Sequence, residues 1–259
     1  MKIKNKITII GSGNVAQQLA PALKNCGHII QEVCNRSAAS GKQLAKKVGA
    51  VYVHDISKVK DADVIIIAVK DDAIPEVIKQ LPPLKNKLVI HTSGATDISV
   101  LKKKFNNCGV LWQVQTIQAR SKVDFKKVPL VIEASNPLAE KKLKQLANDL
   151  SDKVYSFNSK QRKVLHLGAV WVNNFPNHLY VIAEALLKKY NMPFELFGPL
   201  MFSTVESGMI NPKVAQTGPA KRNDKKTMGE HLKLLPDKNY RELYEMISKS
   251  ILKLQNQKG

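Results

Sequence analysis

The segment "ITIIGSGNVAQQLA" (residues 7–20) decides the fold. A short apolar run leads directly into Gly11, Gly13 and Ala16, which have the spacing GxGxxA, and a helical pattern follows. In a strand–turn–helix unit, the first glycine permits the tight turn and the second lets a pyrophosphate approach the backbone. The start of the helix also offers unpaired N–H groups to an anion. The segment therefore predicts a dinucleotide site, which we expect to include the neighbouring residues Ser12, Asn14 and Val15.

Further strands and helices alternate after this unit. Helical patterns cover residues 14–26 and 37–48, and another helix starts after Asn136, an N-cap followed by Pro137. Short apolar runs, typical of strands, cover residues 6–10, 29–34, 50–53, 63–69, 87–94, 110–114, 129–134 and 153–157. This rhythm predicts a doubly wound, mostly parallel sheet of the Rossmann type.

The strand signals stop after about Phe157. Residues 159–190 have an apolar period near 3.6, with an expected kink at Pro176, and we expect further helices at about 193–207 and, after a loop at 208–223, up to residue 254. The predicted fold is therefore α/β, with a Rossmann-type domain (residues 1–158) followed by an all-helical C-terminal domain (residues 159–259).

The end of the second strand indicates which dinucleotide binds. An NAD enzyme usually places Asp or Glu there to bind the ribose 2′-hydroxyl. This chain has Asn35, Arg36 and Ser37, which supply the cation and the polar donors that a 2′-phosphate needs. Glu32 is a rival ribose ligand, but it lies earlier, inside the strand. The pattern favours NADP.

Two later strand ends are expected to complete the cofactor site, because ligands of open parallel sheets bind beyond the carboxyl ends of the strands. Ala68 and Val69 follow the fourth strand, and Ser93 and Gly94 follow the fifth. His91 ends the fifth strand, and we interpret it as a core histidine rather than a catalyst.

The composition limits the class of partner. The net charge of +20 suggests nucleic acid, but only five of the 41 basic residues are Arg, and aromatic residues make up only 6%. Nucleic-acid readout relies on Arg, so we expect no nucleic-acid partner. No apolar run approaches a membrane span. The three cysteines show no metal-ligand spacing, so we expect no metal and a reducing, cytoplasmic location.

A polar stripe runs along the long helix of the second half. His166, Asn174 and Asn177 fall within about 80° of one another on a helix of 100° per residue. The stripe is either a buried hydrogen-bond network between helices or the wall of a pocket that faces the nicotinamide.

The segment "QTGPAKRNDKKTMGEH" (residues 216–231) interrupts the helical pattern. Asp224 has the place of a helix cap, and it is also a candidate substrate ligand. Arg222 is a candidate clamp for a carboxylate or phosphate, with an ion pair to Glu206 as the alternative. His231 is either a general acid or a packing histidine.

The stretches "GSGNVA", "NRS", "HTSGATDISVL", "HLGAVWVNNFPNHLY" and "QTGPAKRND" extend the comparison over most of the chain. Their pattern resembles the superfamily of pyrroline-5-carboxylate reductase, 6-phosphogluconate dehydrogenase and the deazaflavin-dependent NADP reductases. It is more similar still to Rossmann-like proteins with a C-terminal helical domain of unknown function. The resemblance implies an NADP-type oxidoreductase and a helical dimer. The β-hydroxyacid dehydrogenases carry a catalytic Lys four residues before an Asn, and here Val170 precedes Asn174 instead.

Two functions follow from these residues. The first is an NADPH-dependent reductase of a small, anionic carbonyl or imine substrate, which binds at the cleft between the domains. His166 or His231 would donate the proton and Arg222 would orient the substrate, with Asn174 in the catalytic group and Asn177 and Asp224 as substrate ligands. The second is a non-catalytic NADP-binding sensor or assembly protein. The apolar residues of the helical half also predict a homodimer through residues 159–259.

Overall fold

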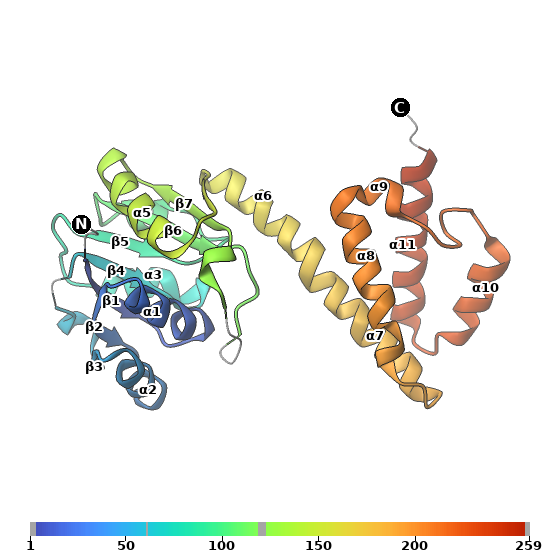
Figure 1. Cartoon of the computed structure of the whole chain (residues 1–259), viewed down its shortest axis with the longest axis horizontal. Helices are drawn as coiled ribbons and strands as arrows, with labels where there is room; N and C mark the ends of the chain where they lie inside the picture. Colours follow the sequence, from blue (N-terminus) through green and yellow to red (C-terminus); the bar gives the residue numbers. More distant parts are fainter. Residues whose placement is uncertain (1–3, 61, 119–122, 257–259) are drawn as a thin grey trace. The chain divides into compact units, whose positions relative to one another are not determined.

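The computed structural model describes residues 4–60, 62–118 and 123–256 of the chain (Figure 1). The chain divides into two compact units, which separate between Val170 and Trp171. We call them unit 1 and unit 2. The sequence places the domain boundary earlier, near Asn158, and that boundary stays a prediction.

Unit 1 contains one eight-stranded sheet with the order β3-β2-β1-β4-β5-β6-β7-β8. All neighbouring strands are parallel except β6 and β7, which are antiparallel. This arrangement confirms the predicted, mostly parallel Rossmann-type sheet. The strands are β1 (Lys6–Ile10), β2 (Ile29–Cys34), β3 (Val51–Val53), β4 (Val64–Ile67), β5 (Leu88–His91), β6 (Cys108–Gln113), β7 (Leu130–Ala134) and β8 (Val154–Ser156).

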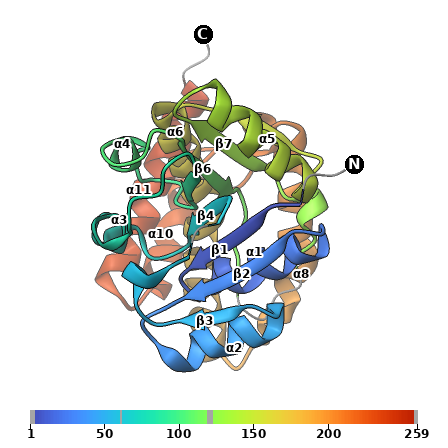
Figure 2. The ribbon, with the colours of Figure 1, turned by 90° about the vertical axis from the view of Figure 1, so that its left-hand side faces the viewer.

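Helices cover both faces of this sheet, as Figure 2 shows. One face packs against α1 (Asn14–Asn25), α2 (Ala38–Val48) and α5 (Pro137–Leu150), and the other against α3 (Ile74–Gln80) and α4 (Ser99–Lys102). Alternate residues of a strand point to opposite faces, so Ile9 joins the first core and its neighbour Ile10 the second. Because both faces are covered, the strands read as continuous apolar runs in the sequence.

The chain passes from unit 1 to unit 2 through a helix that is not regular. Helix α6 (Ser159–Ala169) begins with a capping box, in which Asn158 and Gln161 each bind the other's backbone N–H. One π-helical segment, Val170–Asn174, then separates it from α7 (Phe175–Lys189). Pro176 lies in the first turn of α7 and has no N–H to donate to the preceding turn, which explains the irregular segment at the expected kink.

Unit 2 is helical, as predicted. After α7 it contains a 3₁₀ turn (Phe194–Phe197), α8 (Gly198–Ile210), α9 (Pro212–Ala215), α10 (Lys225–Leu234) and α11 (Lys238–Asn256). The predicted loop at 208–223 is wrong in its first half. Helix α8 continues to residue 210, and the amide oxygen of Asn211 then caps the short helix that starts at Pro212.

Unit 2 buries little of its apolar surface by itself. Of its described residues, only Leu187, Ala220 and Leu235 are buried hydrophobics. Large apolar side chains are exposed instead, among them Trp171 (63% exposed) and Ile210 (87% exposed). No helix in the described part of the chain has both the length and the apolar character needed to cross a membrane.

Candidate functional site

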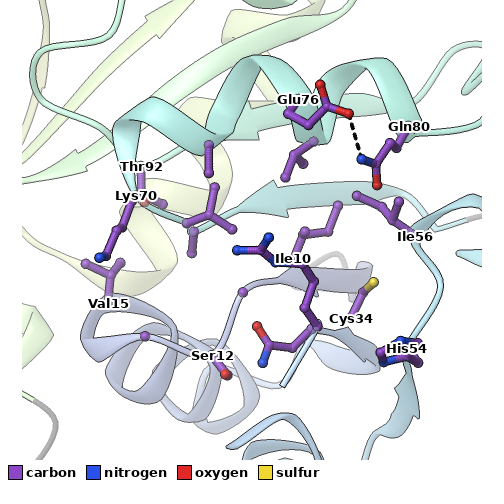
Figure 3. A pocket seen from close by; sticks show the side chains of 18 of the residues that line it. Ile10, Ser12, Val15, Cys34, His54, Ile56, Lys70, Glu76, Gln80 and Thr92 are labelled. Atoms are coloured by element: carbon purple, nitrogen blue, oxygen red, sulfur yellow. Dashed lines mark hydrogen bonds between the residues drawn. The ribbon is translucent and has the colours of Figure 1, made fainter. Parts of the chain in front are cut away.

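A cavity of about 1050 Å³ opens beyond the carboxyl ends of the parallel strands (Figure 3). It lies where the strand order changes direction, since β1 pairs with both β2 and β4. Ligands of doubly wound sheets bind at this switch point. The lining residues follow β1 to β5 and begin α1 and α3: Ile10, Gly11, Ser12, Gly13, Asn14, Val15, Cys34, Asn35, Arg36, His54, Asp55, Ile56, Ala68, Val69, Lys70, Ala73, Glu76, Val77, Gln80 and Thr92.

The glycine turn after β1 has the geometry that the sequence predicts. Gly11 has φ +108°, and its N–H donates to the Cys34 carbonyl at 2.8 Å. A Cβ at this position would collide with the Ala68 carbonyl, so no larger residue fits. Gly13, in contrast, has nothing within 4 Å of an added Cβ and borders the cavity. In the described part of the chain, no side chain caps the start of α1, so its N–H groups remain available to an anion.

The end of β2 is ordered by a hydrogen-bond network. The Asn35 amide donates to the Ser37 carbonyl at 2.9 Å and to Ser40 Oγ at 3.2 Å, and Ser12 Oγ donates to Ser40 Oγ at 2.8 Å. This network links the β2 turn to the glycine turn. The exposed Arg36 guanidinium and Ser37 hydroxyl have no hydrogen-bond or ion-pair partner among the described residues. Arg36 therefore borders the cavity with its charge unpaired, whereas Ser37 begins α2 outside the lining.

Glu32, the rival ribose ligand, lies away from the cavity. Its side chain is 1% exposed and accepts hydrogen bonds from the Lys60 backbone N–H at 2.9 Å and from Thr8 Oγ1 at 3.5 Å. The carboxylate is therefore already used inside the fold. This geometry favours the interpretation that the β2 end receives a phosphate rather than a free ribose hydroxyl.

The turn after β5, at Ser93 and Gly94, uses its polar groups in hydrogen bonds within the protein. Ser93 Oγ donates to the Asp71 carboxylate at 2.7 Å, and the Ser93 N–H donates to His91 Nδ1 at 3.2 Å. The carbonyls of Ser93 and Gly94 accept from Arg162. Neither Ser93 nor Gly94 lines the cavity, although Thr92 just before them does. We therefore expect this turn to shape the nicotinamide end of the site more than to bind the cofactor through its own polar groups.

Arg162 on α6 holds this turn, a role that no motif in the sequence indicates. Its side chain is fully buried and forms a 2.9 Å ion pair with Glu133 of β7. It also donates to the Gly94 carbonyl at 2.8 Å and the Ser93 carbonyl at 3.1 Å. The scarcity of Arg in this Lys-rich chain could have pointed to the role of Arg162. A buried cation with several hydrogen-bond partners is usually Arg, since Lys is poorly suited to that role.

His166 lies one turn after Arg162 on the same helix and packs over the β5 turn. Its ring centroid is 5.6 Å from that of Trp112, and its Cδ2 lies 2.5 Å from where a Cβ of Gly94 would be. Only glycine leaves room for the imidazole here. The structure thus brings one of the predicted catalytic residues to the carboxyl end of β5, close to the nicotinamide end of the predicted site.

His91 is the last residue of β5, just before this turn, and is fully buried. Burial, together with the positive charge of Arg162, lowers the pKa of His91 to about 3, so its imidazole is neutral. Its Nδ1 accepts the Ser93 N–H, and Nε2 has no hydrogen-bond partner among the described residues. This environment supports its interpretation as a core histidine.

The remaining predicted substrate residues belong to unit 2. Asp224 caps α10 by accepting from the Thr227 N–H at 3.1 Å and hydroxyl at 2.8 Å, and these bonds hold the pKa of its carboxyl below the usual value. His231 Nδ1 lies 2.8 Å from the Tyr244 hydroxyl. Arg222 is exposed, and among the described residues it forms no ion pair with Glu206.

The polar stripe of the long helix is divided by the irregular segment. Asn174 ends the π-helical segment and Asn177 lies in α7, and both are exposed within unit 2, whereas His166 belongs to unit 1. The two asparagines therefore form no buried network inside unit 2.

Several cavity residues carried no signal in the sequence analysis. His54 and Asp55 follow β3, Lys70 follows β4, and Glu76 and Gln80 on α3 hydrogen-bond to each other at 2.8 Å. The sequence around these residues contains no motif that marks them as part of a binding site. In the described part of the chain, no group of three His, Cys, Asp or Glu side chains has the geometry to hold a metal ion.

Two family models match separate parts of the chain, and the second match begins within unit 1 and continues into unit 2. Residues 6–94 match the family described as "NADP oxidoreductase coenzyme F420-dependent". Residues 128–251 match a domain of unknown function, DUF2520.

Solved structures extend the match to nearly the whole chain. A protein from Bacteroides fragilis, named as a candidate NADP oxidoreductase, is 38% identical, with a TM-score of 0.88 over 96% of this chain and 98% of that one. An imine reductase from Myxococcus stipitatus in complex with NADP⁺ is 16% identical, with a TM-score of 0.67 over 97% of this chain and 93% of that one. At that identity the second similarity shows the fold alone.

Curated relatives match over a shorter region. Glutamyl-tRNA reductase from Saccharolobus islandicus is 29% identical over 160 residues, which is 61% of this chain. The match spans about a third (34%) of the length of that protein. The match therefore shows a similarity to part of a reductase and carries nothing of its activity to this chain.

The Arg162–Glu133 pair gives a stability prediction. We expect Arg162→Met to lower the free energy of unfolding by about 3–5 kcal/mol, because it leaves Glu133 unpaired in a mostly buried place. In the double variant with Glu133→Gln we expect a smaller loss, since no unpaired charge remains. Urea unfolding followed by circular dichroism measures both.

The matched control is Lys163→Met, which removes a neighbouring cation that pairs with Asp97 at 3.2 Å on the surface of the same helix. That change should cost at most about 1 kcal/mol. An Arg162→Met variant that is as stable as the control would show that the buried pair contributes little to the stability of unit 1.

Proposed function

Because the chain belongs to the family of NADP oxidoreductases with a C-terminal domain of unknown function, we propose that it is an NADPH-dependent reductase of a small, anionic carbonyl or imine substrate. The observation that carries the proposal is the cavity at the switch point of the sheet, which combines the glycine turn, the uncapped start of α1 and the unpaired Arg36. The imine part of the proposed substrate class follows the name of the imine reductase, whose similarity to this chain is one of fold alone.

The residues present fit an NADP molecule. The backbone at Gly13 is open to the cavity, so a pyrophosphate can approach it, and the start of α1 supplies N–H donors. Arg36 offers a bidentate cation to the 2′-phosphate, and Ser37 offers a hydroxyl. Ala68, Val69 and Thr92 then border the part of the cavity that leads to the nicotinamide.

When bound, NADPH would supply a hydride to the electrophilic carbon of the substrate. The protein must then deliver a proton to the substrate nitrogen or oxygen. We propose His166 as the donor, because it lies over the β5 turn in unit 1, with His231 as the alternative. The Lys of the β-hydroxyacid dehydrogenases has no counterpart at Val170, so the proton donor in this chain is of another type.

The substrate ligands are proposed to come from unit 2. The exposed Arg222 would bind an anionic group, and the cap at Asp224 fixes the start of α10 directly after it. The exposed amides of Asn174 and Asn177 would donate to the substrate. The few cysteines agree with a reducing, cytoplasmic location.

We also propose a homodimer through residues 159–259. Unit 2 has only three buried hydrophobic residues among those described, and it leaves Trp171, Phe202 and Met209 largely exposed. A helical unit with so little core gains stability when a second copy covers its apolar side chains. A symmetric dimer is the most frequent way in which proteins achieve this.

A second candidate function is an NADP-binding sensor or assembly protein without catalysis. The absence of the dehydrogenase Lys favours it over a reductase that uses that mechanism. Both candidates use the same cofactor site, but only the reductase would oxidise NADPH in the presence of a substrate.

The first test concerns the cofactor. We expect NADPH to bind more tightly than NADH, and Arg36→Ala to weaken NADPH binding by about 1.5–3 kcal/mol while NADH binding hardly changes. Isothermal titration calorimetry measures both. Arg241→Ala, which removes the same charge from α11, is the control. Equal affinities of the unmodified protein for the two cofactors would rule out this assignment.

The second test concerns turnover. A panel of cyclic imines and small oxo acids is mixed with NADPH, and the oxidation of NADPH is followed by the loss of its absorbance. We expect at least one substrate to be reduced. We expect Arg222→Lys to slow the reaction at least about tenfold with unchanged NADPH binding and melting temperature, because Lys lacks the planar fork. If NADPH binds and no member of the panel is reduced, the sensor is the better description.

The third test concerns assembly. Analytical ultracentrifugation at micromolar concentration should show a dimer. We expect the interface of this dimer to bury more than about 1,200 Å². Two charges placed in the exposed apolar surface, as in Phe202→Glu with Met209→Lys, should give a monomer. The control, Leu138→Glu in unit 1, alters an exposed apolar residue outside residues 159–259 and should leave the dimer intact. A monomeric unmodified protein would contradict the proposal.

A further inference from the structure

The tips of β2 and β3 bring Arg36 and His54 to one end of the cavity. The strands are parallel and in register, with Cys34 beside Val53, and the Asn35 N–H donates to the Val53 carbonyl at 3.1 Å. Arg36 therefore leaves β2 next to His54, which leaves β3, because paired strands lie about 4.8 Å apart. Both residues line the cavity, and Figure 3 shows His54 beside Cys34.

The hydrogen bonds of Tyr52 determine which nitrogen of His54 carries a proton. The Tyr52 hydroxyl donates its only hydrogen to the Asn35 carbonyl at 2.9 Å. The same hydroxyl lies 3.2 Å from His54 Nδ1. Because the hydroxyl hydrogen is used, its oxygen can only accept, so Nδ1 must be the donor. In the neutral imidazole Nε2 is then a bare acceptor, and it becomes a donor only in the imidazolium form.

Charged groups of both signs lie around His54 and Arg36. Asp55 is next in the chain, but its carboxylate accepts from the Ser57 N–H at 2.9 Å and hydroxyl at 2.7 Å, which hold its pKa below the usual value, so it stays ionised. Lys58 approaches the same carboxylate at 3.9 Å. The like charge of Arg36 disfavours a second cation until a phosphate lies between them.

Two other groups complete the surroundings. Burial raises the pKa of the Cys34 thiol to about 11, so this side chain adds no negative charge to the end of the cavity. Lys42 on α2 lies 6.0 Å from the centre of the Tyr52 ring and adds positive charge on that side. A phosphate dianion at this place would pair with the Arg36 guanidinium and with a protonated His54.

We propose that His54 is a second ligand of the cofactor 2′-phosphate and binds it as an imidazolium, so that binding of NADP takes up a proton that binding of NAD does not. The inference rests on the proposed NADP site. The proton comes from the solvent and is bound at Nε2, which then donates to a phosphate oxygen. His54 therefore contributes to the preference for NADP, in addition to Arg36.

The experiment measures proton uptake directly. NADP⁺ and NAD⁺ are titrated by calorimetry at about pH 7.5, where a phosphate monoester is mostly dianionic, in three buffers of different ionisation enthalpy. The slope of the binding enthalpy against the ionisation enthalpy gives the number of protons bound. We expect a clear uptake with NADP⁺ and almost none with NAD⁺.

His54→Gln keeps a hydrogen-bond donor but has no proton to gain. We expect it to abolish the uptake and to weaken NADP⁺ binding roughly three- to tenfold, with NAD⁺ binding unchanged. His178→Gln, at an exposed position of α7, is the matched control and should behave like the unmodified protein. Circular dichroism confirms that the variants are folded.

The outcomes separate the inference from the function on which it rests. If NADP⁺ binds more tightly than NAD⁺ without proton uptake, or if His54→Gln retains the uptake, the role of His54 is wrong while the NADP site stands. If NADP⁺ does not bind at all, the proposed function fails and the inference fails with it.

Discussion

The close approach of Gly11 to the Ala68 carbonyl is the constraint on which the cofactor site depends. It brings the end of β1 against the end of β4, where the strand order changes direction. The positive φ of Gly11 then turns the chain so that α1 starts at the edge of the cavity with its N–H groups uncapped. A side chain at this position would separate the two strand ends. The turn, the cavity and the anion-binding helix start therefore follow from one residue without a Cβ.

A second constraint operates at the other end of the cavity. The buried guanidinium of Arg162 joins α6, the β5 turn and β7 through one ion pair and two carbonyls. Breaking any of these contacts would leave a charge or a carbonyl unpaired in the interior, so the three elements keep one arrangement. That arrangement places His166 over Gly94 and beside Trp112. The candidate proton donor is thus held by the packing of unit 1 itself.

The sequence allowed most of the sheet to be predicted, because strands buried on both faces appear as apolar runs and the glycine spacing marks the switch point. It did not allow the roles of Arg162 or His54 to be predicted. Their partners lie far away in the chain or on a neighbouring strand, such as Glu133 for Arg162, and only the packing brings them together. The loop predicted at 208–223 was partly wrong, because the cap at Asn211 restarts a helix that the apolar period does not show.

The central claim is that NADP lies along the carboxyl ends of β1 to β5, with its 2′-phosphate at the tip of β2. A crystal structure of the protein with NADP⁺ tests this claim most directly. The account predicts the pyrophosphate against the backbone of Gly13 and the start of α1, and the 2′-phosphate within hydrogen-bond distance of Arg36. A cofactor bound elsewhere, or a 2′-phosphate that points away from Arg36, would contradict it.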